Sequence, residues 1–162
     1  MHKTFIILMH NQIKTETRLA FIQFIFSSFF NDTSIDDNII DFENYFYKLS
    51  VSSIEHNKDS SIEFNKNYLK KLALSYKQFM KKNDVDNIIN SLIDFERKFE
   101  SWDTINKSII LSIFSELEIT KREKVKILLN DYFNISKSFI PKKEIGMINA
   151  ITDKYVNEKK II

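Results

Sequence analysis

Only one glycine, Gly146, and one proline, Pro141, occur in the 162 residues of this chain. Typical proteins contain about 7% glycine and about 5% proline. Tight turns between β-strands depend largely on glycine, proline, asparagine and aspartate, so this chain has few ways to build hairpins or barrels. The near absence of glycine and proline therefore predicts an all-α fold.

Apolar residues recur at helical spacing along most of the chain. One stripe consists of Ile35, Ile39, Phe42, Phe46 and Leu49, whose steps of four and three residues place them on one side of a helix. Similar stripes predict helices over about residues 15–30, 60–82, 84–99, 103–117 and 141–160, with one more from residue 120 onward, and leave residues 1–14 open. We therefore expect a single domain over residues 1–162, folded as a compact bundle of about six or seven helices.

The same stripes predict which side chains lie in the core. In the helix at residues 60–82 these are Leu69, Leu72, Ala73, Tyr76, Phe79 and Met80. In the next helix they are Val85, Ile88, Ile89, Leu92, Phe95 and Phe99. Trp102 lies between two predicted helices, where it either packs at their junction or serves as an exposed anchor for a partner.

Side chains suited to capping mark most of the predicted helix starts. Ser34 is placed to accept a hydrogen bond from the backbone N–H of Asp37. Capping-box spacing, in which Ser or Thr precedes Glu by three residues, occurs at residues 60–63 and 120–123. Further predicted start positions are Asn83 or Asp84, Asp103 and, in the first turn of the last helix, Pro141.

Several classes of enzymatic site are excluded by composition and spacing. Cysteine is absent, which removes disulfides, thiol nucleophiles and thiolate metal sites. The three histidines, His2, His10 and His56, lack the spacing of a zinc site. One glycine cannot form a glycine-rich phosphate loop, and no spacing suggests a catalytic triad. We therefore expect a protein without enzymatic activity.

Neither a membrane span nor a targeting segment is predicted. The apolar stretch at residues 19–30 covers about 12 residues, whereas a membrane-spanning helix needs about 20. Residues 5–9 are also too few for the apolar part of a signal peptide. Together with the lack of cysteine, these features lead us to expect a cytoplasmic protein.

Two segments, residues 19–51 and 105–136, share one order of features and suggest pseudo-repeats. Each has an apolar helix, a short acidic loop and a capped amphipathic helix. In the second segment, residues 115–123 (SELEITKRE) resemble the loop of the TerB-like family, which includes tellurite-resistance proteins and the N-terminal part of DjlA-type co-chaperones. Leu117 and Thr33 stand where the family pattern has glycine.

The resemblance implies a non-enzymatic helical module that scaffolds protein complexes. It also implies that acidic loops at the surface bind a divalent cation, Ca²⁺ or Mg²⁺, through Asp32, Asp36, Glu116 and Glu118. The alternative for acidic residues in a first helical turn is that they complement the helix dipole, worth about 0.3–1 kcal/mol each.

Lys66, Lys70, Lys77 and Lys81 fall within an arc of about 60° on one predicted helix. Such a stripe suits a nucleic-acid backbone or an acidic partner, and it is also typical of a solvated helix face. The sequence thus leaves two alternatives to the scaffold: a nucleic-acid-binding helix bundle, and a regulatory or immunity-type protein that binds one protein partner through an acidic or aromatic face. A protein partner is expected, and the oligomeric state stays open.

Overall fold

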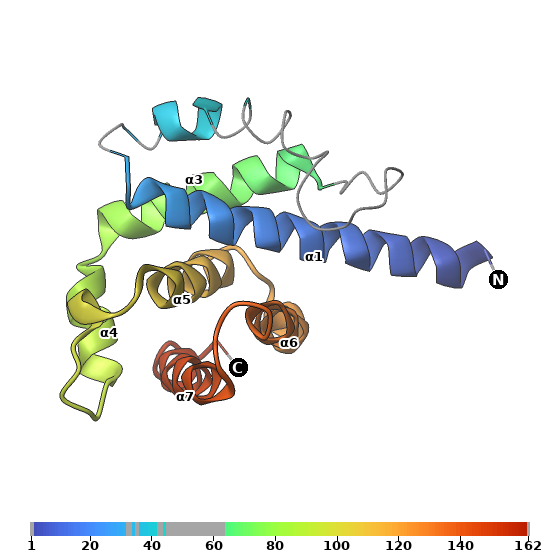
Figure 1. Cartoon of the computed structure of the whole chain (residues 1–162). Coiled ribbons are helices and arrows are strands. Elements are labelled where there is room, and N and C mark those ends of the chain that lie inside the picture. The colour runs from blue at the N-terminus through green and yellow to red at the C-terminus, as the bar shows by residue number, and fades with distance from the viewer. Residues whose placement is uncertain (1, 32–33, 35, 42–43, 45–63, 162) are drawn as a thin grey trace. The chain divides into compact units, whose positions relative to one another are not determined.

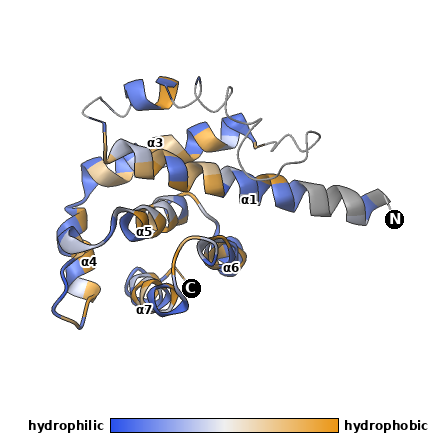
Figure 2. Ribbon diagram, in the orientation of Figure 1, coloured by the Kyte–Doolittle hydropathy of each residue, from blue (hydrophilic) through white to orange (hydrophobic). Residues whose placement is uncertain are grey.

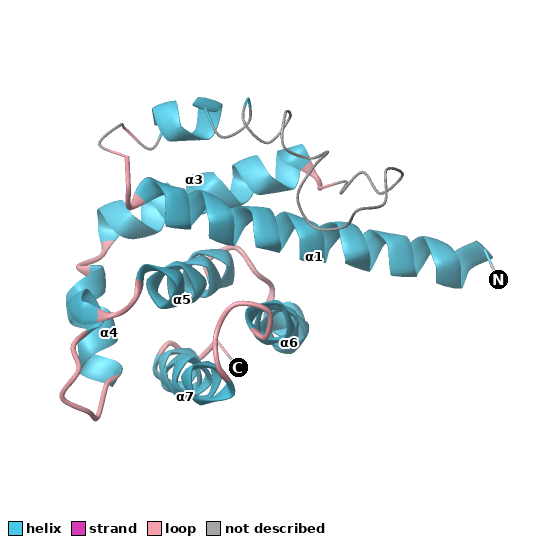
Figure 3. Cartoon of the chain, viewed as in Figure 1, coloured by secondary structure: helices cyan, strands magenta, loops and turns pink. Residues whose placement is uncertain are grey.

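The computed structural model describes residues 2–31, 34, 36–41, 44 and 64–161. Within these residues the regular secondary structure is entirely helical, which confirms the predicted all-α class (Figure 3). In the same part of the chain, no helix has the length and apolar character needed to cross a membrane. The chain divides into two compact units, residues 1–73 and 74–162. The single domain over residues 1–162 and the pseudo-repeats stay predictions.

The first unit is built on α1 (His2–Ser28), a helix of 27 residues. The helix predicted over residues 15–30 therefore begins earlier, and residues 2–14, which the sequence left open, are helical. Around Phe21, nearly every side of α1 is buried. The Thr17 hydroxyl donates to the Ile13 carbonyl at 2.7 Å and accepts from the Asn65 N–H at 2.9 Å. This hydroxyl therefore connects α1 to Asn65, which directly precedes the next long helix at residues 66–82.

The predicted cap at Ser34 is confirmed. Its hydroxyl oxygen accepts from the Asp37 N–H at 3.1 Å, and helical residues follow at 36–41. Ile39, the second residue of the predicted stripe, is buried. The remaining residues of that stripe, Ile35, Phe42, Phe46 and Leu49, lie outside the part of the chain that the structure describes in full.

Helix α3 (Lys66–Lys82) buries the face that the sequence predicts. The buried residues are Leu69, Leu72, Ala73, Tyr76 and Phe79, and Met80 is half-buried. The predicted start near residue 60 is wrong, because residues 64–65 are not helical and the Asn65 side chain accepts from the Tyr68 N–H at 3.0 Å. The predicted capping box at residues 60–63 lies outside the described residues.

The second unit contains the C-terminal half of α3 and four further α-helices. These are α4 (Val85–Leu92), α5 (Thr104–Leu117), α6 (Val125–Ser136) and α7 (Lys142–Glu158), with short 3-10 helices η1 (Phe99–Ser101) and η2 (Arg122–Lys124) between them. Helices α5, α6 and α7 all contact one another, and α4 contacts α7 (Figure 1).

Helix α5 forms the centre of this unit. Every residue from 108 to 117 is buried, as expected for a helix covered on all sides. The Phe114 ring stacks on the Tyr155 ring of α7 at a centroid distance of 4.0 Å, and the Phe79 ring meets it edge-on at 6.3 Å. Helices α6 and α7 instead contain a mixture of apolar and polar residues, which fits burial on one side only (Figure 2).

The helix predicted over residues 84–99 is too long. Its start is confirmed, since the Asp84 carboxylate accepts from the Asn87 N–H at 3.3 Å, but α4 ends at Leu92. Phe95, predicted to lie in the core, is 40% exposed, whereas Phe99 is buried in η1. The chain turns here because the Asn90 side chain accepts from the Phe99 N–H at 2.8 Å and donates to the Glu100 carboxylate at 3.0 Å, which holds η1 against α4. The helical spacing of the phenylalanines does not reveal these contacts.

The capping box predicted at residues 120–123 is also wrong. The Thr120 hydroxyl donates to the Glu116 carbonyl at 2.5 Å and so closes the end of α5. The chain then enters α6 through η2, and neither Lys121 nor Lys124 at the two start positions makes a side-chain cap. Pro141 directly precedes α7, close to its predicted place in the first turn.

Candidate nucleic-acid interface

All four lysines of the predicted basic stripe lie on α3. Lys66 and Lys70 belong to the first unit and are exposed. Lys77 and Lys81 belong to the second unit, where Lys77 is half-buried and Lys81 is exposed. The step of four residues places the members of each pair on the same side of the helix. Each unit therefore presents two α3 ammonium groups on one side of this helix.

Three of the four residues predicted to bind a cation can be placed. Asp32 lies outside the described residues, and Asp36 is exposed in the helical segment at residues 36–41. Glu118 is exposed at the end of α5 and accepts from the Tyr155 hydroxyl at 3.3 Å. Burial and the nearby Glu118 carboxylate raise the pKa of Tyr155 well above its ordinary value. Among the residues that the structure describes, no three acidic or histidine side chains form a group that could hold a metal ion.

Glu116 does not lie in a surface loop as the sequence interpretation placed it. It is in the last turn of α5 and has 0% exposure. Its carboxylate accepts from the Tyr132 hydroxyl of α6 at 2.5 Å. Buried carboxylates need hydrogen-bond partners, and the Tyr132 hydroxyl provides one. Glu116 therefore links α5 to α6 through this hydrogen bond.

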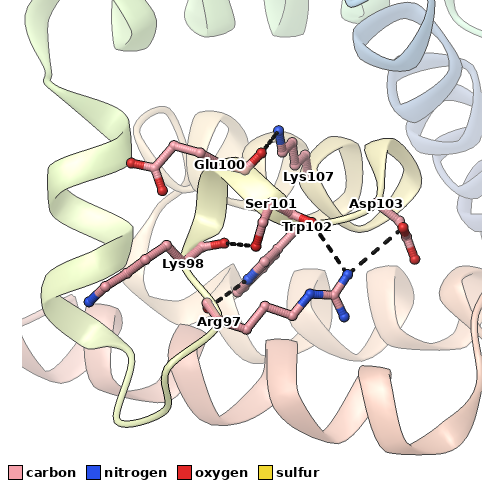
Figure 4. A network of polar contacts seen from close by, with 7 residues as sticks. All are labelled: Arg97, Lys98, Glu100, Ser101, Trp102, Asp103 and Lys107. Atoms are coloured by element: carbon pink, nitrogen blue, oxygen red, sulfur yellow. Dashed lines mark hydrogen bonds and ion pairs between the residues drawn. The ribbon is translucent and has the colours of Figure 1, made fainter.

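Arg97 and the α5 residue Lys107 help to hold the α4–α5 connection, residues 93–103, in place (Figure 4). The Lys107 ammonium donates to the Glu100 carbonyl at 2.8 Å and lies 5.7 Å from the centroid of the Phe99 ring. The Arg97 guanidinium lies 3.8 Å from the Asp103 carboxylate and donates to the Ser101 carbonyl at 3.4 Å. These two cations are engaged within the connection and its flanking helix.

Trp102 packs at the junction of η1 and α5. It is buried, and its ring meets the Phe99 ring at 5.3 Å and 70°. The indole N–H donates to the Arg97 carbonyl at 3.4 Å. The interpretation of Trp102 as a junction residue is therefore confirmed, and the alternative of an exposed anchor is wrong. Asp103 begins α5 as predicted but makes no side-chain cap, because its carboxylate faces Arg97.

The α5–α6 connection, residues 118–124, contrasts with the previous one in its exposed cations. Lys121, Arg122 and Lys124 are all exposed, as is Lys126 in the first turn of α6. In the described part of the chain no ion pair engages any of them. The sequence prediction missed this cluster, although four basic residues in the six from 121 to 126 were a readable signal.

The fold and its surface therefore define an all-α protein that presents cations on α3 and on the α5–α6 connection. The chain is similar to the transcription antitermination protein NusB of Rickettsia felis, with 23% identity over 149 residues that span 92% of this chain and 94% of that protein. The NusB protein of Rickettsia bellii is 24% identical over 91% of this chain and 92% of its own length. For the NusB protein of Rhodopseudomonas palustris, 22% identity extends over 84% of this chain and 74% of that protein. No protein-family model matches the chain.

These relatives overturn the resemblance to the TerB-like family and the scaffold function inferred from it. The structure gives the physical reason at residues 115–123. Glu116 is a buried residue of α5, and Thr120 ends α5 by hydrogen bonding instead of capping α6. The short pattern that suggested a family loop is thus the end of one helix followed by a 3-10 turn.

Proposed function

We propose that this chain is a non-enzymatic, nucleic-acid-binding protein that acts in transcription antitermination. The observation that carries the proposal is the similarity to proteins named NusB, which extends over 92% of this chain and 94% of the Rickettsia felis protein. This support does not rest on one motif, because the match extends along most of both chains. The nucleic-acid-binding alternative drawn from the α3 lysines fits this class better than a scaffold does.

The exposed cations on α3 supply the chemistry that the proposal needs. Lysine ammonium groups neutralise phosphates and release counterions, which gives affinity without reading sequence. Lys70 and Lys81 are exposed, each in a different unit. Binding through such groups weakens steeply with salt, so salt dependence is the property to measure.

The binding test is fluorescence anisotropy with a short, labelled single-stranded RNA of mixed sequence, over about 50 to 200 mM salt. We expect the Kd to rise steeply across this range. The double variant Lys70→Glu and Lys81→Glu should weaken binding by about tenfold or more. A matched control, Lys98→Glu with Lys159→Glu, makes the same change in charge at exposed lysines outside α3. Equal losses in both variants would contradict a role for α3.

The activity test is read-through of a terminator in a bacterial transcription extract. Adding the purified protein should raise the fraction of transcripts that pass the terminator. The α3 double variant should give less of this effect than its matched control. Unchanged read-through, or RNA binding that is absent or insensitive to salt, would overturn the proposed function.

A protein partner, also expected from the sequence, is supported by exposed aromatic side chains at the end of α1. Phe26, Phe29 and Phe30 are exposed, and the rings of Phe26 and Phe30 lie 5.2 Å apart. Exposed aromatic clusters are typical of protein interfaces. If this one binds a partner in the antitermination complex, Phe29→Ser with Phe30→Ser lowers read-through but leaves RNA affinity unchanged. A loss of both, or of neither, would contradict this role.

A further inference from the structure

A dense run of positive charge in the second unit lies on the α5–α6 connection and the first turn of α6. Residues 121–126 contain four basic residues and one acidic residue, Glu123, which gives a net charge of +3. The whole chain has a net charge of only +2. A protein that is nearly neutral overall can attract a polyanion only through such a local patch.

The side chains of this patch are available to a ligand. Lys121, Arg122, Lys124 and Lys126 are exposed, and no described residue engages them in an ion pair. The α4–α5 connection is different. Its Arg97 contacts Ser101 and Asp103, and Lys107 of α5 contacts Glu100 and Phe99 within it. An exposed charge whose interactions are all with water loses little internal bonding when it binds a phosphate.

A row of hydrogen-bond donors continues the patch along α6. Lys126, Asn130, Asn134 and Lys137 fall within an arc of about 80° at 3.6 residues per turn. All four are exposed, and the Lys137 ammonium donates to the Asn134 side-chain carbonyl at 3.1 Å. The buried face of α6, which includes Leu128 and Tyr132, points to other sides of the helix. The row contains no carboxylate.

The length and chemistry of the row suit a nucleic-acid strand. From Lys126 to Lys137 the helix rises about 16 Å. Because a strand in a duplex advances about 3.4 Å per nucleotide, the row matches about five nucleotides. Amide side chains can donate to phosphate and sugar oxygens and can also pair with base edges. A binding site for an acidic peptide would need the same cations, but the asparagines would then add little.

We propose that η2 and the outer face of α6 form a second RNA-contacting surface, in which Lys121, Arg122 and Lys124 bind backbone phosphates and the Lys126–Lys137 row follows the strand. This inference rests on the proposed nucleic-acid binding and deepens it by naming a surface distinct from α3. The three cations Lys121, Arg122 and Lys124 dominate the affinity, and the α6 row contributes contacts along the strand.

The test replaces Lys121, Arg122 and Lys124 together by glutamine and measures RNA affinity against salt. For a single strand, each neutralised phosphate contributes about 0.7 to the slope of log affinity against log salt, so we expect the slope to fall by about two. Affinity at about 50 mM salt should fall by about tenfold or more. The matched control replaces Lys98, Lys159 and Lys160 by glutamine, which removes the same three charges at other exposed positions.

A second variant tests the α6 row. The variant Asn130→Asp with Asn134→Asp changes side-chain size very little but introduces two carboxylates. Compared with the wild type, it should bind RNA more weakly and have an unchanged melting temperature. If the wild type binds RNA and both variants retain its affinity and salt slope, the second surface is wrong and the proposed function survives. If the wild type shows no RNA binding, both fail. Loss of binding to polyglutamate with unchanged RNA affinity would assign the surface to an acidic protein and would overturn the inference.

Discussion

The two connections that flank α5 differ in what their cations do. At the α4–α5 connection, Arg97 and the α5 residue Lys107 bind neighbouring carbonyls, a carboxylate and an aromatic ring. In the α5–α6 connection, Lys121, Arg122 and Lys124 are exposed and form no ion pair among the described residues. A basic residue therefore identifies a binding surface only once its partners within the fold are known.

The difference follows from the lengths of the connections. The α4–α5 connection runs over residues 93–103 and contains two buried aromatic residues, Phe99 and Trp102. Ordering so many residues costs conformational entropy, so hydrogen bonds and ring contacts are needed to offset it. The α5–α6 connection is shorter, and the bond from Thr120 to the end of α5 and the η2 turn already fix its backbone. Its cations are not required for that purpose.

The largest expected effect concerns Trp102. Trp102→Ala removes a buried indole and its contact with Phe99, and should lower the free energy of unfolding by about 3–5 kcal/mol. Urea denaturation followed by circular dichroism measures this change. RNA affinity of the folded variant should equal that of the wild type. If Trp102→Ala costs little stability, the contacts of the α4–α5 connection do not stabilise the fold and the comparison between the two connections is wrong.

Tyr132→Phe tests what holds the ends of α5 and α6 together beneath the α5–α6 connection. The change removes the hydroxyl that donates to the buried Glu116 carboxylate, and should cost about 1–3 kcal/mol of stability. The double variant with Glu116→Gln should lose less stability than the sum of the losses in the two single variants, because both changes remove the same contact. Strictly additive losses in urea denaturation would argue against the contact.

Lys107→Gln and Lys124→Gln compare the two connections directly. Lys107→Gln loses a hydrogen bond and a ring contact, and should lower stability by about 1 kcal/mol without changing RNA affinity. Lys124→Gln should change stability by less than about 0.5 kcal/mol and weaken RNA binding. Denaturation and anisotropy on the same samples separate the two effects. The comparison fails if both variants behave alike.

The smallest effect concerns pH. Hydrogen bonds from the Asn90 amide are the main cause that lowers the pKa of Glu100 below its ordinary value of 4.5. A lowered pKa in the folded state means that Glu100 contributes its full stability above pH 4.5 and loses it as the pH falls through the folded-state pKa. Glu100→Gln should therefore reduce the loss of stability on acidification. Melting temperatures of the wild type and the variant, measured as the pH falls below 4.5, test this expectation. If the two melting temperatures fall in parallel with pH, the effect is excluded.

Much of the helical fold was predictable because it depends on local signals. The buried face of α3 follows from the spacing of Leu69, Leu72 and Tyr76, and the caps at Ser34 and Asp84 follow from side chains that bind backbone N–H groups within three residues. Periodicity and capping are properties of a few consecutive residues, so the sequence shows them directly.

The errors arise where distant contacts decide the outcome. Phe95 and Phe99 continue the helical spacing of α4, but Asn90 binds the backbone of η1 and the chain leaves the helix. The resemblance to the TerB-like loop places Glu116 at the surface, whereas Tyr132, 16 residues away, supplies a buried partner. The prediction overlooks the cations of residues 121–126 because it interprets residues 120–123 only as a capping box.

The serines of α5 have a consequence for how the second unit opens. Ser108, Ser112 and Ser115 are buried, and each hydroxyl donates to a carbonyl of the same helix. The Ser115 carbonyl also accepts from the Ser75 hydroxyl of α3 at 2.6 Å. Polar groups satisfied in this way let small side chains sit in the core without attracting water. Amide protons in the middle of α5 should therefore exchange with deuterium more slowly than those of η1 or η2, making α5 the last part of this unit to open.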